Sequence, residues 1–213
     1  MAELRRFSYD ARMMIQHPNE AEELRAEIAA LAARMIAEDG ADYASAKRKA
    51  AKQLLGNQKI KGDILPDNAQ IEQEVREYNA LFFGDTQPQR LRHLRELALE
   101  LMQDLERFNP YLVGAVLNGT AGNHSDIYLH LYTENTKDVA IFLLNKDVQF
   151  EVSESFNRRN ESVETLSFLY ENEGVHLVLH DQDAIRNSGG TGNKSTERAS
   201  LTALRQILAS DTE

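Results

Sequence analysis

The sequence predicts an α+β protein in which a helical N-terminal half is followed by a mixed β-sheet and a C-terminal helix. Apolar residues recur with the helical period of about 3.6 as far as Phe108, and beyond Asn109 the period falls to about 2. Of the 213 residues, 42% are hydrophobic and 27% are charged, as in ordinary globular proteins. We therefore expect a helical region over residues 1–85 and an α+β domain over residues 86–213.

Four helices are expected in the first half, over about 20–38, 41–55, 67–82 and 86–108. The first two end at Gly40 and Gly56, and glycine is the residue most often found just past a helix. The third begins at Asp67, whose carboxylate can accept a free amide of the first turn. Gln70 occupies the reciprocal position of a capping box.

The second half alternates short apolar runs with turn-like segments. Strands are expected near residues 112–117, 126–133, 138–144, 149–155, 165–170 and 175–179. A polar stretch with three glycines follows at 187–193, and a helix from about 195 to 209 closes the pattern. We expect the helical region to pack on this sheet or next to it.

The composition excludes several kinds of site. The chain has no cysteine, which rules out disulfides, thiolate metal sites and cysteine nucleophiles. Its net charge of −10 argues against non-specific nucleic-acid binding by the whole chain, so nucleic acid is not an expected partner. No apolar run approaches the length of a transmembrane helix, and none follows Arg5 and Arg6 as it would in a secretory signal. We therefore expect a cytoplasmic protein without membrane contact.

A dense basic run begins on the second expected helix. It consists of Lys47, Arg48, Lys49, Lys52, Lys59 and Lys61. These cations could contact the phosphates of a nucleotide or a nucleic acid. A solvated face is favoured, because no aromatic residues alternate with the cations for base stacking. The helical half is also the expected surface for a protein partner.

The candidate chemistry lies where the first two expected strands meet. The first strand is expected to end in the turn Gly119-Thr120, and Ser125 and Asp126 open the second. A carboxylate is the kind of oxygen ligand that Mg²⁺ prefers. Residues i and i+2 point to the same face of a strand, so Tyr128 shares a face with Asp126.

This pattern resembles the signature of the polymerase-β-type nucleotidyltransferase superfamily. In that family a strand ends in Gly-Ser or Gly-Gly, a second strand begins with Asp-x-Asp or Asp-x-Glu, and a third carboxylate lies on a neighbouring strand. The resemblance implies a mixed-sheet nucleotidyltransferase-like core. It also implies a nucleoside triphosphate bound at Gly119, Thr120 and Ser125, and Mg²⁺ held by Asp126 and Asp138 as the catalytic carboxylates.

One position departs from the family pattern. Tyr128 stands where the second carboxylate is expected, and a phenol with a pKa near 10 is a poor magnesium ligand. A replacement carboxylate could come from Glu151, Glu154 or Glu164. Two functions therefore stay open. One is binding of a nucleoside triphosphate with Mg²⁺ and transfer of its nucleotidyl group to an unknown acceptor. The other is a non-catalytic domain of the same fold that acts in protein interaction or nucleotide sensing.

The whole chain is also similar to short bacterial proteins, some of which carry the label UDP-N-acetylmuramate–alanine ligase. Ligases of that kind use a phosphate loop that ends in Gly-Lys-Thr or Gly-Lys-Ser. The nearest stretch, Gly-Gly-Thr-Gly-Asn-Lys-Ser at 189–195, places Asn193 between the last glycine and the lysine. We therefore expect a flexible linker there and no ligase activity.

The histidines offer weaker candidates. His176 and His180 would stand roughly 13 Å apart along a strand, which is too far for one metal ion. His124 and His130 flank Asp126 and could serve as phosphate contacts or as a base. A polar surface role is favoured for both.

Overall fold

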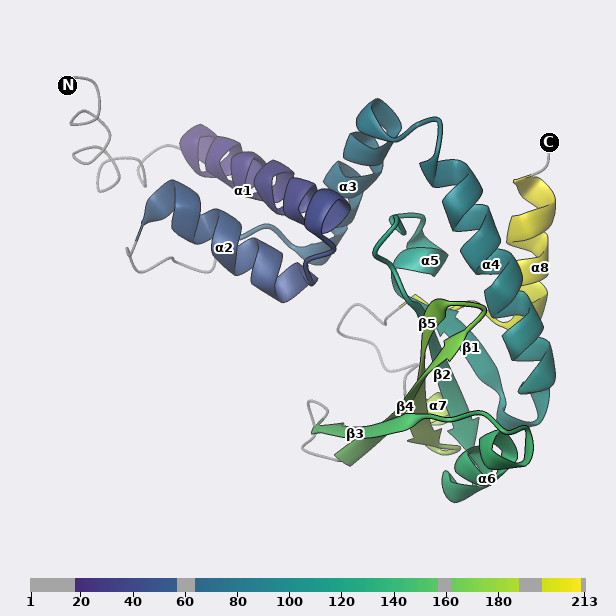
Figure 1. Ribbon diagram of the computed structural model, residues 1–213. Coiled ribbons are helices and arrows are strands. Elements are labelled where there is room, and N and C mark those ends of the chain that lie inside the picture. The colour runs from purple at the N-terminus through teal and green to yellow at the C-terminus, as the bar shows by residue number, and fades with distance from the viewer. Residues whose placement is uncertain (1–17, 57–63, 157–161, 188–196, 212–213) are drawn as a thin grey trace. The chain divides into compact units, whose positions relative to one another are not determined.

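The computed structural model describes residues 18–56, 64–156, 162–187 and 197–211. It shows an α+β protein, which confirms the expected class (Figure 1). The chain divides into two compact units, Met1–Gly84 and Asp85–Glu213. Lys59, Lys61 and the stretch 189–195 lie outside the described residues.

The N-terminal unit contains α1 (Pro18–Asp39), α2 (Tyr43–Leu55) and α3 (Asn68–Phe82). The expected capping box at the start of α3 is confirmed. Asp67 Oδ1 accepts a hydrogen bond from Gln70 N, and Gln70 Oε1 accepts one from Asp67 N, both at 2.9 Å. Small side chains dominate the core and let α1 pack closely on both other helices. The buried core residues are Ile28, Ala29, Ala32, Ala33, Ala46, Ala50, Ala51, Ile71 and Val75.

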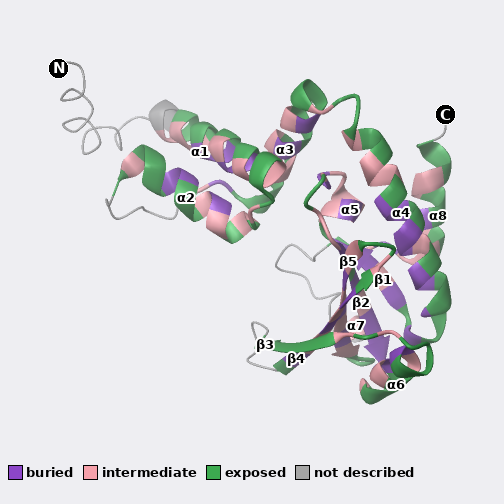
Figure 2. Ribbon diagram, viewed as in Figure 1, coloured by how far each residue is buried: buried purple, intermediate pink, exposed green. Residues whose placement is uncertain are grey.

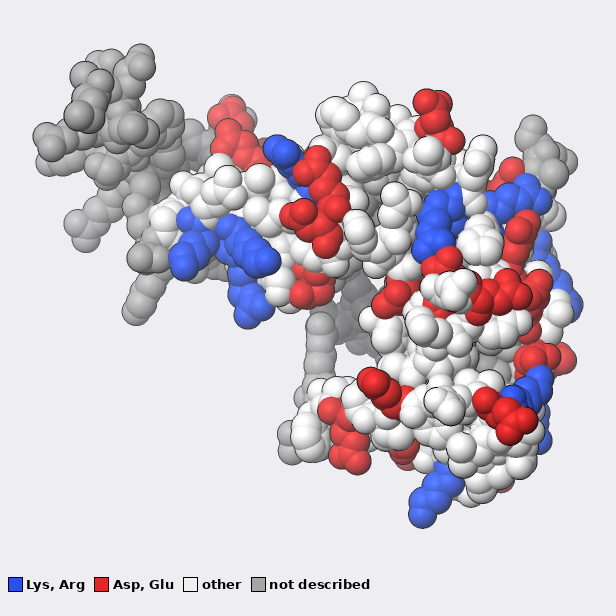
Figure 3. Space-filling model, in the orientation of Figure 1, with Lys and Arg blue, Asp and Glu red and all other residues white. Residues whose placement is uncertain are grey.

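Cations gather on the solvent side of α2 (Figure 3). Arg48, Lys49 and Lys52 are exposed, whereas Ala46 and Ala50 on the opposite side of the helix are buried. This exposure is what a solvated basic face requires. Contact between these cations and phosphates stays a prediction.

The C-terminal unit combines a mixed sheet with helices. Its elements are α4 (Gln87–Asp104), the 3-10 turn η3 (Glu106–Phe108), β1 (Pro110–Val113), α5 (Ala115–Asn118), β2 (Ile127–Thr133), α6 (Lys137–Asn145), β3 (Glu151–Phe156), β4 (Ser162–Tyr170), β5 (Glu173–Asp181), α7 (Ala184–Asn187) and α8 (Leu201–Ser210). The strands lie in the order β1-β2-β5-β4-β3. Strand β5 runs parallel to β2, and the other neighbouring pairs are antiparallel. The last strand in sequence is therefore the central strand of the sheet.

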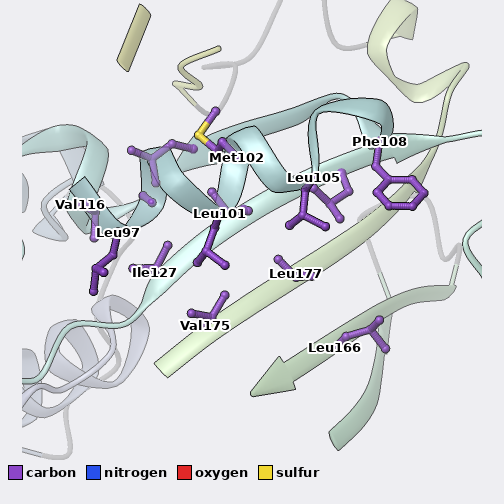
Figure 4. Close-up of a cluster of buried hydrophobic side chains, with 14 of the residues drawn as sticks. Leu97, Leu101, Met102, Leu105, Phe108, Val116, Ile127, Leu166, Val175 and Leu177 are labelled. Carbon is purple, nitrogen blue, oxygen red and sulfur yellow. The ribbon is translucent and has the colours of Figure 1, made fainter. Parts of the chain in front are cut away.

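The core of this unit covers one face of the sheet. Ile127, Leu129 and Leu131 of β2 are fully buried, as the alternation in the sequence predicts. They belong to one cluster with Leu97 and Leu101 of α4, which lie above the strands in Figure 4. Helix α8 packs beside α4. In Figure 2 the buried residues follow these strands and one side of α4. The opposite face of the sheet carries the polar and aromatic side chains discussed below.

Two strand expectations are wrong. Residues 138–144 belong to helix α6, because Val139 and Leu143 are buried one helical turn apart while their neighbours are more exposed. The first strand ends at Val113, because Gly114 follows with φ 73° and begins helix α5. The strands expected near 126–133, 149–155, 165–170 and 175–179 are confirmed as β2, β3, β4 and β5.

The final helix is shorter than the sequence suggests. It begins after Ser200, whose side chain accepts a hydrogen bond from Ala203 N at 3.3 Å. Ala199 just before it pairs with Leu112 of β1. In the described part of the chain, no helix is long and apolar enough to cross a membrane.

Candidate functional site

The polar groups of the expected nucleotide-binding turn form hydrogen bonds within the protein. Thr120 is buried, and its hydroxyl donates to Asn118 Oδ1 at 2.7 Å. Gln87 of α4 donates through Nε2 to the carbonyl oxygens of Gly119 and Ala121, at 3.2 and 2.8 Å. This turn therefore serves to fix α5 and the following loop to α4.

Asp126 and Asp138 are not brought together. Asp126 precedes β2, whereas Asp138 follows it in the first turn of α6 and accepts a hydrogen bond from Asn135 Nδ2 at 2.9 Å. Strand β2 has seven residues, which at about 3.3 Å each separates the two carboxylates by roughly 20 Å. One metal ion cannot bind both. The expected pairing of Asp138 with Asp126 failed because residues 138–144 form a helix at the far end of β2.

The partner of Asp126 is instead a histidine on β5. Asp126 Oδ2 lies 3.0 Å from His176 Nε2, and His176 Nδ1 lies 2.9 Å from Ser167 Oγ on β4. The strand register accounts for this series, because Tyr128, His176 and Ser167 are direct cross-strand neighbours on β2, β5 and β4. All lie on the face of the sheet opposite the core.

The hydrogen bonds fix the tautomer of His176. A carboxylate accepts hydrogen bonds only, so the proton of the neutral imidazole lies on Nε2 and points at Asp126. Nδ1 then carries a lone pair, and the hydroxyl of Ser167 donates to it. The opposite tautomer would place two acceptors 3.0 Å apart. Asp126 therefore orients His176 as a hydrogen-bond acceptor for Ser167.

Tyr128 stacks on this histidine. The two ring centroids are 4.5 Å apart and the ring planes differ by 22°. Burial raises the pKa of the Tyr128 phenol, and the negative charge of Asp126 raises it further. Tyr128 is therefore a neutral phenol at physiological pH, and 41% of its surface remains exposed.

A pocket of about 1100 Å³ opens at the end of the sheet where β2 and β5 begin. Ser125, Asp126, Ser167 and His176 line it. The expected nucleotide-binding residues Gly119 and Thr120 are not among its lining residues. The other polar or charged lining residues are Arg90, Asn123, His124, Asp147, Gln149, Glu151, Asn172 and Glu173. Acidic groups outnumber basic groups around this pocket.

An ion pair in the wall of the pocket, on the core side of the sheet, joins α4 to β5. Both Nη atoms of Arg90 bind the carboxylate of Glu173, with Nη2 and Oε2 2.6 Å apart. The Arg90 hydrogen bonds lower the pKa of Glu173, and the same bonds raise the pKa of Arg90. The two side chains are 21% and 15% exposed, so solvent screens this pair only partly.

A pair of histidines lies further along the same strands. His180 Nε2 and His130 Nδ1 are 3.2 Å apart, and the ring of Tyr132 stacks on His180. Burial lowers the pKa of His130 to about 4, with smaller contributions from His180 and the positive charge of Arg198. Burial also lowers the pKa of His180. Both imidazoles are therefore neutral at physiological pH.

The side chains around Asp126 do not fit a pair of magnesium ions. Magnesium prefers hard oxygen ligands, whereas the hydrogen-bond partner of Asp126 is an imidazole, on which a neutral phenol stacks. Among the described residues, no group of three or more histidine, aspartate and glutamate side chains could hold a metal ion. Glu154 and Glu164 pair with each other across β3 and β4 and do not line the pocket, whereas Glu151 does.

Sequence reasoning missed several residues of this site. The first strand ends at Val113, four residues before the expected end at residue 117, so the loop that leads to Asp126 begins earlier than expected. His176 is a polar residue on the alternation of β5, opposite buried Val175 and Leu177. No local signal links it to Asp126 or Ser167, because the link arises from strand pairing.

Comparison with known proteins gives little similarity. No protein-family model and no curated protein matches the chain. Among solved structures, a chain from the structure of the GLD-2/RNP-8 complex matches with 19% sequence identity and a TM-score of 0.30. The match covers 55% of this chain and 49% of that chain, so it spans about half of each. Similarity at this level carries no argument about fold or function.

Proposed function

We propose that the pocket beside Asp126 binds a nucleoside triphosphate as its magnesium complex and that no two-metal nucleotidyl transfer takes place there. The observation that carries this proposal is the hydrogen bond between Asp126 and His176. Because Tyr128 and His176 are its neighbours on the sheet, Asp126 is the single carboxylate at the start of β2. Two-metal transfer needs several carboxylates. Ser125 and Asp126, two residues of the sequence pattern that resembles the nucleotidyltransferase signature, line this pocket and support a nucleotide as the ligand.

The negative charge of the pocket lining favours the magnesium complex of the nucleotide over the free nucleotide. Asp126, Asp147 and Glu151 line it, and Arg90 is already neutralised by Glu173. A bare triphosphate would be repelled by this lining, whereas a magnesium complex carries less negative charge. A volume of about 1100 Å³ accommodates a ligand of nucleotide size.

Calorimetric titration with ATP and GTP tests the proposal, in magnesium and again in a chelator. We expect binding only with magnesium and at least about tenfold weaker binding by Asp126→Ala, because the Asp126 carboxylate is proposed to attract the magnesium of the complex. Asp138→Ala is the matched control, because its carboxylate lies at the far end of β2, and it should bind like the wild type. Absence of binding at millimolar nucleotide would overturn the proposal. Pyrophosphate release during incubation would overturn the part that denies transfer.

A further inference from the structure

The hydrogen-bonded series of Ser167, His176 and Asp126 has a chemistry that goes beyond nucleotide binding. All three side chains line the same pocket, and the two bonds that join them measure 2.9 and 3.0 Å. They have the composition and the order of a nucleophile, a base and a group that orients the base. The imidazole is reversed relative to the usual arrangement, since Nδ1 faces the serine and Nε2 faces the carboxylate.

Both hydrogen bonds run in the direction that proton transfer from Ser167 to His176 requires. The Asp126 carboxylate keeps the Nε2 proton in place, so the lone pair of Nδ1 is directed at the Ser167 hydroxyl. When that hydroxyl loses its proton, the imidazolium that forms lies between Ser167 and a negative charge that stabilises it. The side chain of His176 is 24% exposed and that of Asp126 is 45% exposed, so the series is open to a ligand in the pocket.

We propose that Ser167 is a nucleophile and that this pocket hydrolyses carboxylic esters. Ser167 Oγ attacks the ester carbonyl carbon, and its proton moves to His176 Nδ1. The bond between the carbonyl carbon and the alcohol oxygen breaks, and the alcohol leaves with the proton from Nδ1. Water then attacks the acyl-serine carbonyl and gives its proton to Nδ1. Ser167 Oγ takes that proton back as the carboxylic acid departs, which restores the starting state.

The surroundings of Ser167 select the class of ester. Tyr128 beside His176 is 41% exposed, and Leu169, two residues from Ser167 on the same face of β4, is 74% exposed. These side chains offer apolar surface to an acyl group. The acidic lining from Asp126 and Glu151 disfavours an anionic ester. The expected substrate is therefore an uncharged ester with an apolar acyl group.

A fluorophosphonate probe tests this inference without any nucleotide, so the result is independent of the proposed nucleotide binding. The full chain is incubated with the probe, and the modified residue is located by peptide mass spectrometry. We expect modification of Ser167, none in Ser167→Ala, and labelling at least about 100-fold slower in His176→Gln, the range found when a general base is removed. Ser153→Ala on neighbouring β3 is the matched control, because Ser153 does not line the pocket, and it should be labelled like the wild type.

Hydrolysis of p-nitrophenyl butyrate provides the second readout. We expect turnover by the wild type and none by Ser167→Ala. Asp126 acts as a positioning residue, so Asp126→Asn should lower kcat while KM and the melting temperature remain near their wild-type values. Absence of labelling or turnover in the wild type would overturn the inference, and so would equal activity in Ser167→Ala. Melting curves of every variant separate these outcomes from a failure to fold.

Discussion

The carboxylate of Asp126 lies directly against the backbone of Gly174. A Cβ added to Gly174 would stand 2.6 Å from Asp126 Cγ, a distance that real Cβ atoms essentially never show. The loop before β2 and the start of β5 can approach this closely only because residue 174 has no side chain. The position of Asp126, and with it the hydrogen bond to His176, therefore depends on this glycine.

Substitution of Gly174 by alanine should displace Asp126. We expect loss of Ser167 labelling and a loss of at most about 1 kcal/mol in the free energy of unfolding, because the atoms that the Cβ would meet end a partly exposed side chain that can rotate away. The fluorophosphonate probe measures the first effect and urea unfolding the second. Gly122→Ala is the control, because an added Cβ there would meet nothing within 4 Å. Equal labelling of the two variants would contradict the close approach.

The ion pair between Arg90 and Glu173 should make the free energy of unfolding fall as the pH becomes acidic. Its hydrogen bonds lower the pKa of Glu173, so the stabilisation is fully present above the ordinary glutamate pKa and is lost as pH falls through the lowered value. Glu173→Gln should cost roughly 1–3 kcal/mol at neutral pH, typical of hydrogen bonds to charged groups, and should flatten the acid dependence. Chemical unfolding between pH 7 and about 3 measures both.

A surface ion pair on the same helix supplies the control for that experiment. Arg92 and Glu96 are 2.9 Å apart, and their side chains are 43% and 50% exposed. Water and salt screen such a pair, so Glu96→Gln should change stability by less than about 1 kcal/mol. If Glu173→Gln lowered the free energy of unfolding by no more than Glu96→Gln does, the partly buried pair would stabilise the fold no more than a surface pair.

Protonation of His130 should also destabilise the fold in acid. Its pKa is about 4 when folded and 6.5 when exposed, so the unfolded chain binds the proton more readily between these values. The destabilisation is absent above pH 6.5 and grows as pH falls, to roughly 3 kcal/mol at about pH 4 by the relation between pKa and free energy. His130→Asn should remove this slope. His124→Asn, at an exposed histidine, should retain it.

Carboxylates at positions 128 and 176 should create a metal site together with Asp126. Tyr128 and His176 are direct neighbours on parallel strands and share the face of Asp126. We expect Tyr128→Asp combined with His176→Asp to bind Mn²⁺, measured by the electron paramagnetic resonance signal of the free ion, because three carboxylates then converge. Adding Asp138→Ala should leave this binding unchanged. Loss of Mn²⁺ binding in this triple variant would show that Asp138 is a metal ligand.

Local patterns in the sequence predicted much of the fold. The capping box of Asp67 and Gln70 involves residues three positions apart, so the sequence contains all of its parts. The alternation through Ile127 and Leu129 likewise identifies the buried face of β2. The segment of α6 was misassigned because a short apolar run with Val139 and Ile141 has the composition of a strand. Only tertiary burial of Val139 with Leu143 distinguishes the two structures.

The site was less predictable than the fold. Asp126 and Ser125 were expected at a binding site, and both line the pocket. His176 lies fifty residues from Asp126 in the sequence, and their contact depends on the parallel register of β2 and β5. Register between distant strands is set by burial and by the connecting segments, and neither appears in a local pattern. Ser167 could not be predicted for the same reason, because its contact with His176 comes from the pairing of β4 with β5.

The central position of β5 has a consequence for the order in which the protein is made. Strands β2 and β4 leave the ribosome first, yet they never touch, because β5 occupies the place between them. Until residues 173–181 have been synthesised, both strands keep an unpaired edge on which other chains can add. Non-local pairing of this kind is slow and exposes a chain to aggregation. A nascent chain halted before Glu173 should therefore need a chaperone, and the pocket assembles only in the last steps of synthesis.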